Sequence, residues 1–287
     1  MNGLPQKFAV LGAAGQLGRD LCALLPGQVT PLTRADADLT QPAALRGKLS
    51  QLRPDVVINC AAYNFVDKAE DEPETACSVN ALGVRSLAEV CRDFGITLVH
   101  FSTDYVFGLE SGRQTPYEEA DPPGPANVYG ASKLMGEYFV RSLCPKHFVI
   151  RTCGLYGRWG SGGKGSNFVE TMLRLAGQGK PLRVVTDQIC TPTYTVDLAK
   201  AAIQAVQASD YGLHHITNAG QCSWYEFAGA IFELAGVKVD LSPTTSAEYG
   251  AKARRPNYSV LASERKETPR LRHWREALAA YLRERVT

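Results

Sequence analysis

The sequence predicts an α/β fold, a doubly wound parallel sheet with a smaller C-terminal lobe. Short apolar runs alternate with longer amphipathic segments over the first half of the 287 residues. This pattern is typical of a parallel sheet with helices on both faces. A glycine-rich loop follows the first apolar run, and polar side chains follow later ones. Because ligands bind beyond the carboxyl ends of strands in such sheets, we expect the functional site there.

The expected elements of the first half follow in alternation. Apolar runs predict strands at 8–11, 29–32, 56–60, 98–102 and 148–151. Helical spacing of apolar residues predicts helices at 17–25, 74–94 and 129–142. The third strand reads VVINC, and such a continuous β-branched run is typical of a strand buried on both faces.

The second half alternates less regularly. Residues 157–165 read GRWGSGGKG, which predicts a loop; its Lys164 could contact a substrate phosphate or simply be solvated. Strands are expected at 183–186 and 213–217, and helices at 167–176, 196–208, 223–235 and 274–283. Ser223 and Glu226 have the spacing of a capping box at the start of the third of these helices.

The composition narrows the classes of partner. A net charge of +2 gives no indication of nucleic acid binding. No apolar run approaches the roughly 20 residues of a membrane helix, and the polar N-terminus does not resemble a signal peptide, so we expect a cytoplasmic protein without a membrane partner.

The eight cysteines include no CxxC pair, which favours reduced, structural thiols. The five histidines show no ligand spacing, and no metal site is predicted.

A glycine loop opens the chain between the first strand and the first helix. It reads GAAGQLG, with glycines at Gly12, Gly15 and Gly18. Glycines in this context permit a tight turn, close approach of a pyrophosphate, and close helix–strand packing. The exposed amides at the helix start favour an anion. We therefore expect dinucleotide binding, with Gln16 and Leu17 lying on the cofactor.

Further cofactor contacts are expected after the second and third strands. Arg34 follows the second strand, where an arginine can pair with the 2′-phosphate of NADPH. A solvated surface arginine is an equal alternative, so NADH stays possible. Asp38 and Leu39 could approach the adenine. The residues expected to face the middle of the cofactor follow the third strand: Ala61, Ala62 and Tyr63.

A YxxxK motif places Tyr129 and Lys133 one helical turn apart. Free tyrosine has a pKa of about 10, and a nearby ammonium is expected to lower it toward the working range. Thr103 follows the fourth strand and offers a hydroxyl beside Tyr129 for a substrate carbonyl oxygen. The order of glycine loop, threonine and YxxxK predicts a nicotinamide-dependent reductase. These three residues, Tyr129, Lys133 and Thr103, are the expected catalytic group.

Together these motifs resemble the extended short-chain dehydrogenase/reductase family with its Rossmann-like fold, and within it the dTDP-4-dehydrorhamnose reductases. The matching stretches are GAAGQLG at 12–18, VVINCAAYNFVDKAEDEPE at 56–74, STDYVFG at 102–108, YGASKLMGE at 129–137, DQ with PT at 187–193, and RP with S.L at 255–261. They run through most of the chain, and their combination is specific although no single stretch is.

The resemblance implies a reaction and an organisation of the chain. NADPH or NADH would reduce the C4 keto group of dTDP-4-dehydro-β-L-rhamnose, with Tyr129 as proton donor. Asp104 could bind the sugar or cap its strand, and Arg255 could meet the diphosphate or form a structural ion pair. We expect residues 1–152 to form a dinucleotide-binding domain, with 183–220 adding to its sheet. Residues 153–182 and 221–287 would form mainly a substrate-binding lobe.

Three departures from the family pattern affect the substrate side. Gly154 stands where the reductases have a tryptophan, and Ala262 stands where an aspartate is usual. The family's STDYVFDG ends here as Phe107-Gly108-Leu109, without its aspartate. They keep open a reductase or epimerase of another nucleotide-activated 4-keto sugar. A non-catalytic NADP-binding regulator is a further alternative. Some members of the family need Mg²⁺ at a dimer contact, so a homodimer is possible and a need for Mg²⁺ stays uncertain.

Overall fold

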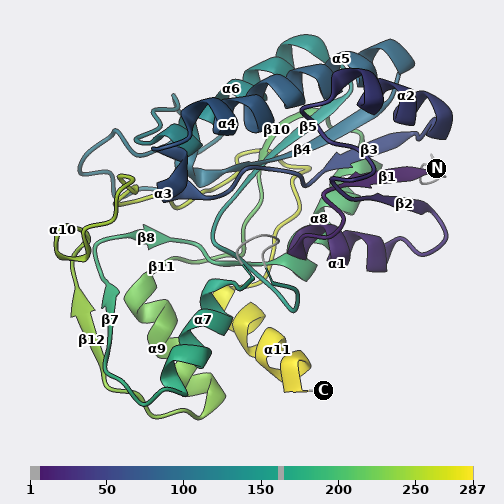
Figure 1. Ribbon diagram of the computed structural model, residues 1–287. Helices are drawn as coiled ribbons and strands as arrows, with labels where there is room; N and C mark the ends of the chain where they lie inside the picture. The colour runs from purple at the N-terminus through teal and green to yellow at the C-terminus, as the bar shows by residue number, and fades with distance from the viewer. Residues whose placement is uncertain (1–6, 161–164, 287) are drawn as a thin grey trace.

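The computed structural model describes residues 7–160 and 165–286 and contains a central parallel sheet (Figure 1). Lys164 lies outside the described residues. The sheet has six strands in the order β10-β5-β4-β3-β1-β2. Their bounds are Phe8–Leu11 (β1), Val29–Leu32 (β2), Val56–Asn59 (β3), Thr97–Thr103 (β4), His147–Thr152 (β5) and Gly212–His215 (β10). The chain moves from β1 to β2 on one side and to β3 on the other, so the crevice of a doubly wound sheet opens between β1 and β3.

Helices cover both faces of this sheet, as predicted. On one face lie α2 (Pro42–Leu52), α5 (Gly83–Phe94) and α6 (Val128–Leu143), and on the other lie α1 (Gln16–Leu24) and α8 (Thr195–Ala208) (Figure 1). Each face has its own apolar core. Because both cores draw side chains from alternate positions of the same strands, as Ala9 and Val10 show, the strands are apolar on both sides.

The helix expected over 74–94 forms, but its backbone changes within it. It consists of α4 (Pro73–Cys77), a π-helical turn η1 (Ser78–Leu82) and α5. Asn80 lies in the π turn and is buried. Its side chain accepts from the Tyr63 N–H at 2.9 Å and donates to the Tyr63 carbonyl at 2.9 Å and to the Ser132 hydroxyl at 3.0 Å. The π turn thus ties the loop after β3, with its short helix α3 (Val66–Ala69), to helix α6.

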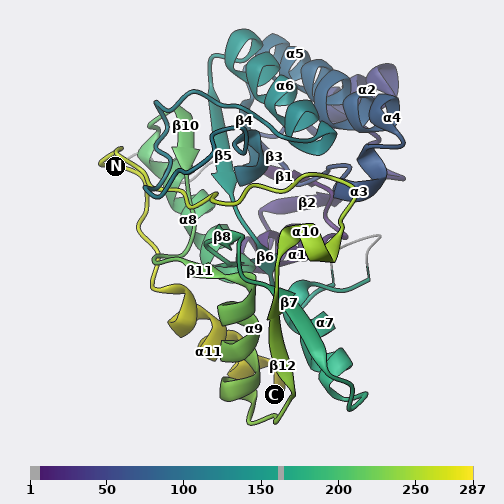
Figure 2. The same cartoon turned by 90° about the vertical axis from the view of Figure 1, so that its left-hand side faces the viewer.

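The C-terminal lobe has a separate core and lies below the sheet in Figure 2. Its helices are α7 (Phe168–Ala176), α9 (Trp224–Ala235) and α11 (Trp274–Val286), with a short α10 (Ser246–Tyr249). The predicted capping box of Ser223 and Glu226 is present at α9. Its short strands pair as β6 (Leu155–Tyr156) with β9 (Thr193–Tyr194), β8 (Ile189–Cys190) with β11 (Cys222–Ser223), and β7 (Leu182–Val185) with β12 (Leu241–Thr244).

The prediction that 183–220 adds to the main sheet was wrong for its first part. Only β10 joins that sheet, where it lies parallel to β5. Strand β7 pairs with β12 in the lobe instead. The sequence could not predict this pairing, because β12 lies about 60 residues further along the chain and local periodicity does not reveal distant partners.

Within the residues described, none of the helices combines the length and apolarity that crossing a bilayer requires. All eight cysteines lie in this part of the chain as free thiols.

Candidate active site

A cavity of about 720 Å³ lies over the carboxyl ends of β1, β3 and β4. Every residue predicted to contact the cofactor lines it: Gly12, Gly15, Gln16, Leu17, Gly18, Arg34, Asp38, Leu39, Ala61, Ala62, Tyr63, Tyr129 and Lys133. These residues come from separate segments over more than 120 positions of the chain. The fold therefore brings the expected set to one place, at the crevice that the sheet topology defines.

Two glycines of the loop, Gly12 and Gly18, lie tightly against neighbouring backbone. Gly12 has φ +72°, and a Cβ there would lie 2.7 Å from the Ala61 nitrogen. A Cβ on Gly18 would lie 2.9 Å from the Ala13 Cα. A side chain at Gly12 would therefore push the loop away from the segment after β3, and one at Gly18 would push helix α1 away from the loop. Among the described residues no side chain caps α1, whose first turn carries no acidic residue. Its free amides therefore suit the pyrophosphate of a dinucleotide.

Arg34 and Asp38 form the rim of this cavity after β2. The Arg34 Nε lies 2.9 Å from the Asp38 carboxylate, and the Arg34 side chain is 81% exposed. An exposed ion pair of this kind contributes little to stability. The guanidinium is therefore free to turn toward a ligand phosphate.

Lys133 lies at the floor of the cavity and is buried. Its Nζ donates to the Phe101 carbonyl at 2.7 Å and lies 3.4 Å from His100 Nε2. Burial lowers the pKa of Lys133 to about 8, and the negative charge of Glu137 offsets part of this effect. The ammonium is thus more easily deprotonated than an exposed lysine.

Tyr129 stands one turn earlier on α6, whose N-terminus is capped by the Asn127 side chain on the Gly130 N–H at 2.8 Å. Burial raises the pKa of Tyr129 to about 12, against the opposing effect of its hydrogen bond with Thr103. The expected lowering of this pKa by Lys133 is therefore not what the structure shows, because loss of water around the phenolate is the largest effect and raises the pKa. A phenol that stays protonated at neutral pH is in the state that a proton donor needs.

A second cavity, of about 310 Å³, adjoins the first. Tyr129, Ser102 and Thr152 line both cavities, so Tyr129 lies at their junction. Thr103 and Asp104 line the second one. This arrangement can hold a cofactor in the larger space and a carbonyl substrate in the smaller, with Tyr129 between them.

Asp104 is buried beside Thr103 and holds three hydroxyl or thiol donors. It accepts from Thr103 Oγ1 at 3.2 Å, from Cys153 Sγ at 3.0 Å and from Ser259 Oγ at 2.6 Å. Burial raises the pKa of Asp104, and these hydrogen bonds act in the opposite direction. The carboxylate joins β4, the chain after β5 and the C-terminal segment around Ser259, so it fixes the shape of the second cavity.

Arg255 does not line either cavity as the described residues define them. Its guanidinium forms a two-pronged ion pair with Asp67, at 2.7 and 3.1 Å. Arg255 was expected either to meet the diphosphate or to form a structural ion pair, and the structure contains the ion pair. The sequence could not indicate this because Asp67 lies 188 positions away.

The comparisons with known proteins agree with this geometry. A family model described as the RmlD substrate binding domain matches residues 6–286. The chain belongs to this family. A relative named dTDP-4-dehydrorhamnose reductase from Mycolicibacterium smegmatis is 44% identical, over 96% of this chain and 84% of its own. The spore coat polysaccharide biosynthesis protein SpsK of Bacillus subtilis is also 44% identical, over 97% of this chain and 98% of its own.

A solved structure extends the likeness to three dimensions. The crystal structure of dTDP-4-dehydrorhamnose reductase from Bacillus anthracis in complex with NADP superposes on this RmlD-family chain with a TM-score of 0.93. The two are 38% identical, and the match covers 98% of this chain and all of the other. The predicted fold class, the doubly wound sheet of the extended dehydrogenases, is confirmed.

Several residues of the RmlD-family site were missed at the level of sequence. Asn167, Phe168, Gln188 and Trp224 line the second cavity. They belong to the lobe. Gln188 lies in the DQ stretch at 187–193 that carries the family resemblance, but the stretch was given no role, and no motif marks the other three. The Phe168 and Trp224 rings lie 4.6 Å apart, but the two residues are distant in the sequence, so only the structure shows that they form an aromatic wall beside the polar groups of the cavity.

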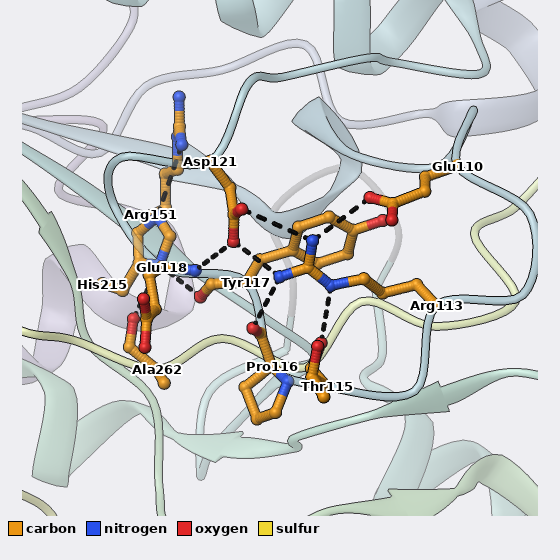
Figure 3. A network of polar contacts seen from close by, with 10 residues as sticks. All are labelled: Glu110, Arg113, Thr115, Pro116, Tyr117, Glu118, Asp121, Arg151, His215 and Ala262. Atoms are coloured by element: carbon orange, nitrogen blue, oxygen red, sulfur yellow. Dashed lines mark hydrogen bonds and ion pairs between the residues drawn. The ribbon is translucent and has the colours of Figure 1, made fainter.

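Behind the site runs a buried polar network that sequence reasoning also missed (Figure 3). The His215 Nδ1 faces the carbonyls of Tyr117 and Ala262 at 3.0 and 2.9 Å, and its Nε2 lies 3.3 Å from Arg151 Nη1. Because carbonyls only accept, Nδ1 carries the proton and Nε2 accepts from Arg151. Ala262, which departs from the family pattern, contributes its backbone here and needs no side chain.

Arg113 closes the outer side of the same network. Its guanidinium bonds the carbonyls of Thr115 and Pro116 and the Asp121 carboxylate, all within 2.7 to 2.9 Å (Figure 3). It therefore holds the turn that carries Tyr117 against the sheet.

In the described part of the chain, no group of three or more His, Cys, Asp or Glu side chains is placed to hold a metal ion, and the role of Mg²⁺ stays a prediction.

Proposed function

We propose that this chain reduces the C4 keto group of dTDP-4-dehydro-β-L-rhamnose with NADPH and produces dTDP-L-rhamnose. The observation that carries the proposal is the junction of two cavities at Tyr129, with Lys133 in one and Thr103 in the other. Membership of the RmlD family and the named relatives support the same substrate class. We also propose that the protein works in the cytoplasm.

The larger cavity would hold the dinucleotide. Its pyrophosphate would lie against the amides that follow Gly12 and open α1, and Arg34 would meet the 2′-phosphate. When bound, the reduced nicotinamide supplies a hydride. The chain itself would contribute orientation, because Lys133 at the cavity floor would hydrogen-bond the nicotinamide ribose. It would also exclude water, because the surrounding strands are buried.

Tyr129 would supply the proton. Its hydroxyl, kept neutral by burial, donates a proton to the C4 oxygen as negative charge develops there. Thr103 would bind the same oxygen and hold it beside Tyr129. The Thr103 hydroxyl donates its single proton to Asp104 at 3.2 Å, so it would turn from Asp104 to the C4 oxygen when the substrate binds.

The test is turnover of this sugar by the wild type and by Tyr129→Phe, followed by the loss of NADPH absorbance. We expect the variant to lose at least about 10²-fold in kcat while its Kd for NADPH changes little. Tyr138→Phe is the matched control, since Tyr138 lies on the same helix and is 53% exposed; it should keep wild-type kcat. Unchanged kcat in Tyr129→Phe would remove Tyr129 as proton donor.

A second candidate function is reduction or epimerisation of a different nucleotide-activated 4-keto sugar. Gly154 motivates it, because it lines the second cavity with no side chain. A panel of such sugars separates the two, and higher kcat/KM for another sugar would replace the first substrate. Binding of NADPH without turnover of any sugar would instead indicate the regulatory alternative.

A further inference from the structure

His100 lies directly behind Lys133, in strand β4, and is completely buried. Its Nε2 is 3.4 Å from Lys133 Nζ, and its Nδ1 is 3.0 Å from Asn59 Nδ2. Neither His100 nor Asn59 lines either cavity as the described residues define them. A buried imidazole between an amide and an ammonium must have a definite arrangement of protons.

The orientation of the Asn59 amide is settled by the backbone. The Ala61 N–H points at Asn59 Oδ1 at 3.1 Å. A backbone N–H can only donate, so the atom that it meets is the amide oxygen. The other end of the amide, Nδ2, is therefore the donor toward His100, and His100 Nδ1 accepts.

The tautomer of His100 follows from that bond. Burial and the charge of Lys133 hold the pKa of His100 well below its ordinary value, so the ring is neutral. A neutral ring that accepts at Nδ1 carries its proton on Nε2. The Nε2–H therefore points at Lys133 Nζ. An ammonium has only donors to offer in return, whereas a neutral amine can accept.

We propose that His100 is a positioning residue that opposes the charging of Lys133, because Asn59 locks its ring with Nε2–H toward Nζ. The long contact of 3.4 Å, beside a bond of only 2.7 Å from Nζ to the Phe101 carbonyl, is the pattern expected when one neighbour accepts from the lysine and the other does not. The proposal deepens the proposed function, since it concerns the lysine of that same site.

Other groups around Lys133 act in the opposite direction or are weak. The Glu137 carboxylate, from the next turn of α6, favours the ammonium, but it is already paired with Arg151 at 2.7 Å. Cys60, after β3, also favours the ammonium, and its own thiol has a pKa that burial raises far above the ordinary value. Tyr129 stays neutral. His100 is thus the nearest group outside the cavity whose proton placement sets what Lys133 can do.

The consequence is a lysine that can exchange a proton near neutral pH. After Tyr129 has given up its proton, it must regain one before the next turnover. A lysine that charges and discharges readily can pass a proton toward the tyrosinate, whereas a permanently charged one only stabilises it. His100 would favour the first behaviour.

The direct test is NMR of the protein labelled with ¹⁵N-histidine, with the His100 signals assigned from their loss in His100→Gln. We expect the wild-type ring to be neutral and protonated on Nε2 across neutral pH. A ring protonated on Nδ1, or on both nitrogens at neutral pH, overturns the proposal. This readout needs neither substrate nor turnover, so it stands apart from the fate of the proposed activity.

The second test measures the charge of Lys133 itself. Titration of ¹³C-lysine signals, assigned with Lys133→Met, gives its pKa in the wild type and in two variants. In His100→Gln the amide oxygen can accept from Nζ, and in Asn59→Asp the carboxylate accepts from Nδ1–H, so that Nε2 becomes an acceptor. Both should raise the pKa of Lys133 by about one unit or more, and the basic limb of the kcat profile should move with it.

The control is His214→Gln, which makes the same change at another buried strand histidine. His214 bonds Thr268 and the Asp210 carbonyl, in strand β10. It should leave the pKa of Lys133 unchanged. If His100→Gln lowers stability as His214→Gln does and leaves the Lys133 titration where it was, then His100 is only a structural residue and the proposal is wrong.

Discussion

Glu137 and Arg151 form a bidentate ion pair that is completely buried beneath the candidate active site. Arg151 Nη2 and Nε lie 2.7 and 2.9 Å from the carboxylate oxygens, and the two side chains are 1% and 0% exposed. The same carboxylate accepts from the Ser102 hydroxyl at 2.5 Å. Since Ser102 lines both cavities, this pair links helix α6, which carries Tyr129, to the strands β4 and β5.

Breaking this pair should strongly destabilise the fold. Glu137→Gln leaves the Arg151 charge uncompensated in the core, and we expect a loss of about 3–5 kcal/mol in the free energy of unfolding, measured by urea denaturation. The matched control is Glu89→Gln in the exposed pair with Arg85, which should lose less than about 1 kcal/mol. Similar losses in the two variants would contradict the assignment of Glu137 as a structural anchor.

Lys133→Met should stabilise the protein near neutral pH while it abolishes turnover. The pKa of Lys133 falls from 10.5 to about 8 on folding, so the unfolded chain binds the proton more tightly. Below pH 8 the buried charge therefore lowers the free energy of unfolding by up to about 3 kcal/mol. The hydrogen bond from Lys133 to the Phe101 carbonyl offsets part of this cost.

Because folding lowers the pKa of Lys133, the difference in stability between the two proteins should depend on pH. Wild-type stability should rise between about pH 8 and 10.5 relative to the methionine variant, as folded Lys133 loses its proton before the unfolded chain does. Urea denaturation of both proteins across this range measures the difference. A gap that does not narrow with rising pH would mean that Lys133 is not desolvated as the structure indicates.

Arg34→Ala should separate the two nicotinamide cofactors. If Arg34 meets the 2′-phosphate, its loss removes a charge-assisted contact that only NADPH makes. We expect KM for NADPH to rise about tenfold or more and KM for NADH to stay nearly constant. Arg46→Ala is the control, because Arg46 is an exposed arginine paired with Asp93 at 2.8 Å away from the cavity. Equal effects on both cofactors would favour the solvated alternative for Arg34.

Trp224 should determine how the sugar nucleotide is held. Its ring edge lies 3.3 Å from where a Gly154 Cβ would stand, and Gly154 has φ +54°. Because Trp224 lines the second cavity and not the first, Trp224→Ala should raise KM for the sugar about tenfold without changing KM for NADPH. Parallel rises in both constants would point to a general loss of structure.

Gly154→Trp tests the same geometry from the opposite side. The family's tryptophan cannot simply be restored, since its Cβ would meet the Pro192 Cα at 3.2 Å and the Trp224 ring at 3.3 Å in a left-handed backbone. We expect a less stable protein with lower activity, measured by thermal unfolding and turnover. An active, equally stable variant would show that this wall of the cavity can rearrange.

Sequence patterns predicted most of the catalytic half because its signals are local. Strands such as Phe8–Leu11 were predicted residue for residue, since continuous apolar runs between turn residues allow few alternatives. The glycine loop and YxxxK depend on spacing within one turn or one helix. The sheet then collected every expected cofactor residue in one cavity, because parallel strands end at the same edge.

The lobe and the electrostatics were less predictable. Strand β7 was assigned to the wrong sheet because pairing depends on β12, far along the chain. The partner of Arg255 and the environment of Tyr129 depend on packing, and burial reversed the expected pKa shift.

By itself, the sequence determined the fold class, the cofactor crevice and the residues at its centre, because periodicity and motif spacing act over a few residues. Only the tertiary structure decided how those residues are charged. The Glu137–Arg151 pair, the locked ring of His100 and the depressed pKa of Lys133 all depend on groups that are distant in the chain and share a water-poor interior. There the free energy of a charge is set by its neighbours and by the loss of water, neither of which local sequence records.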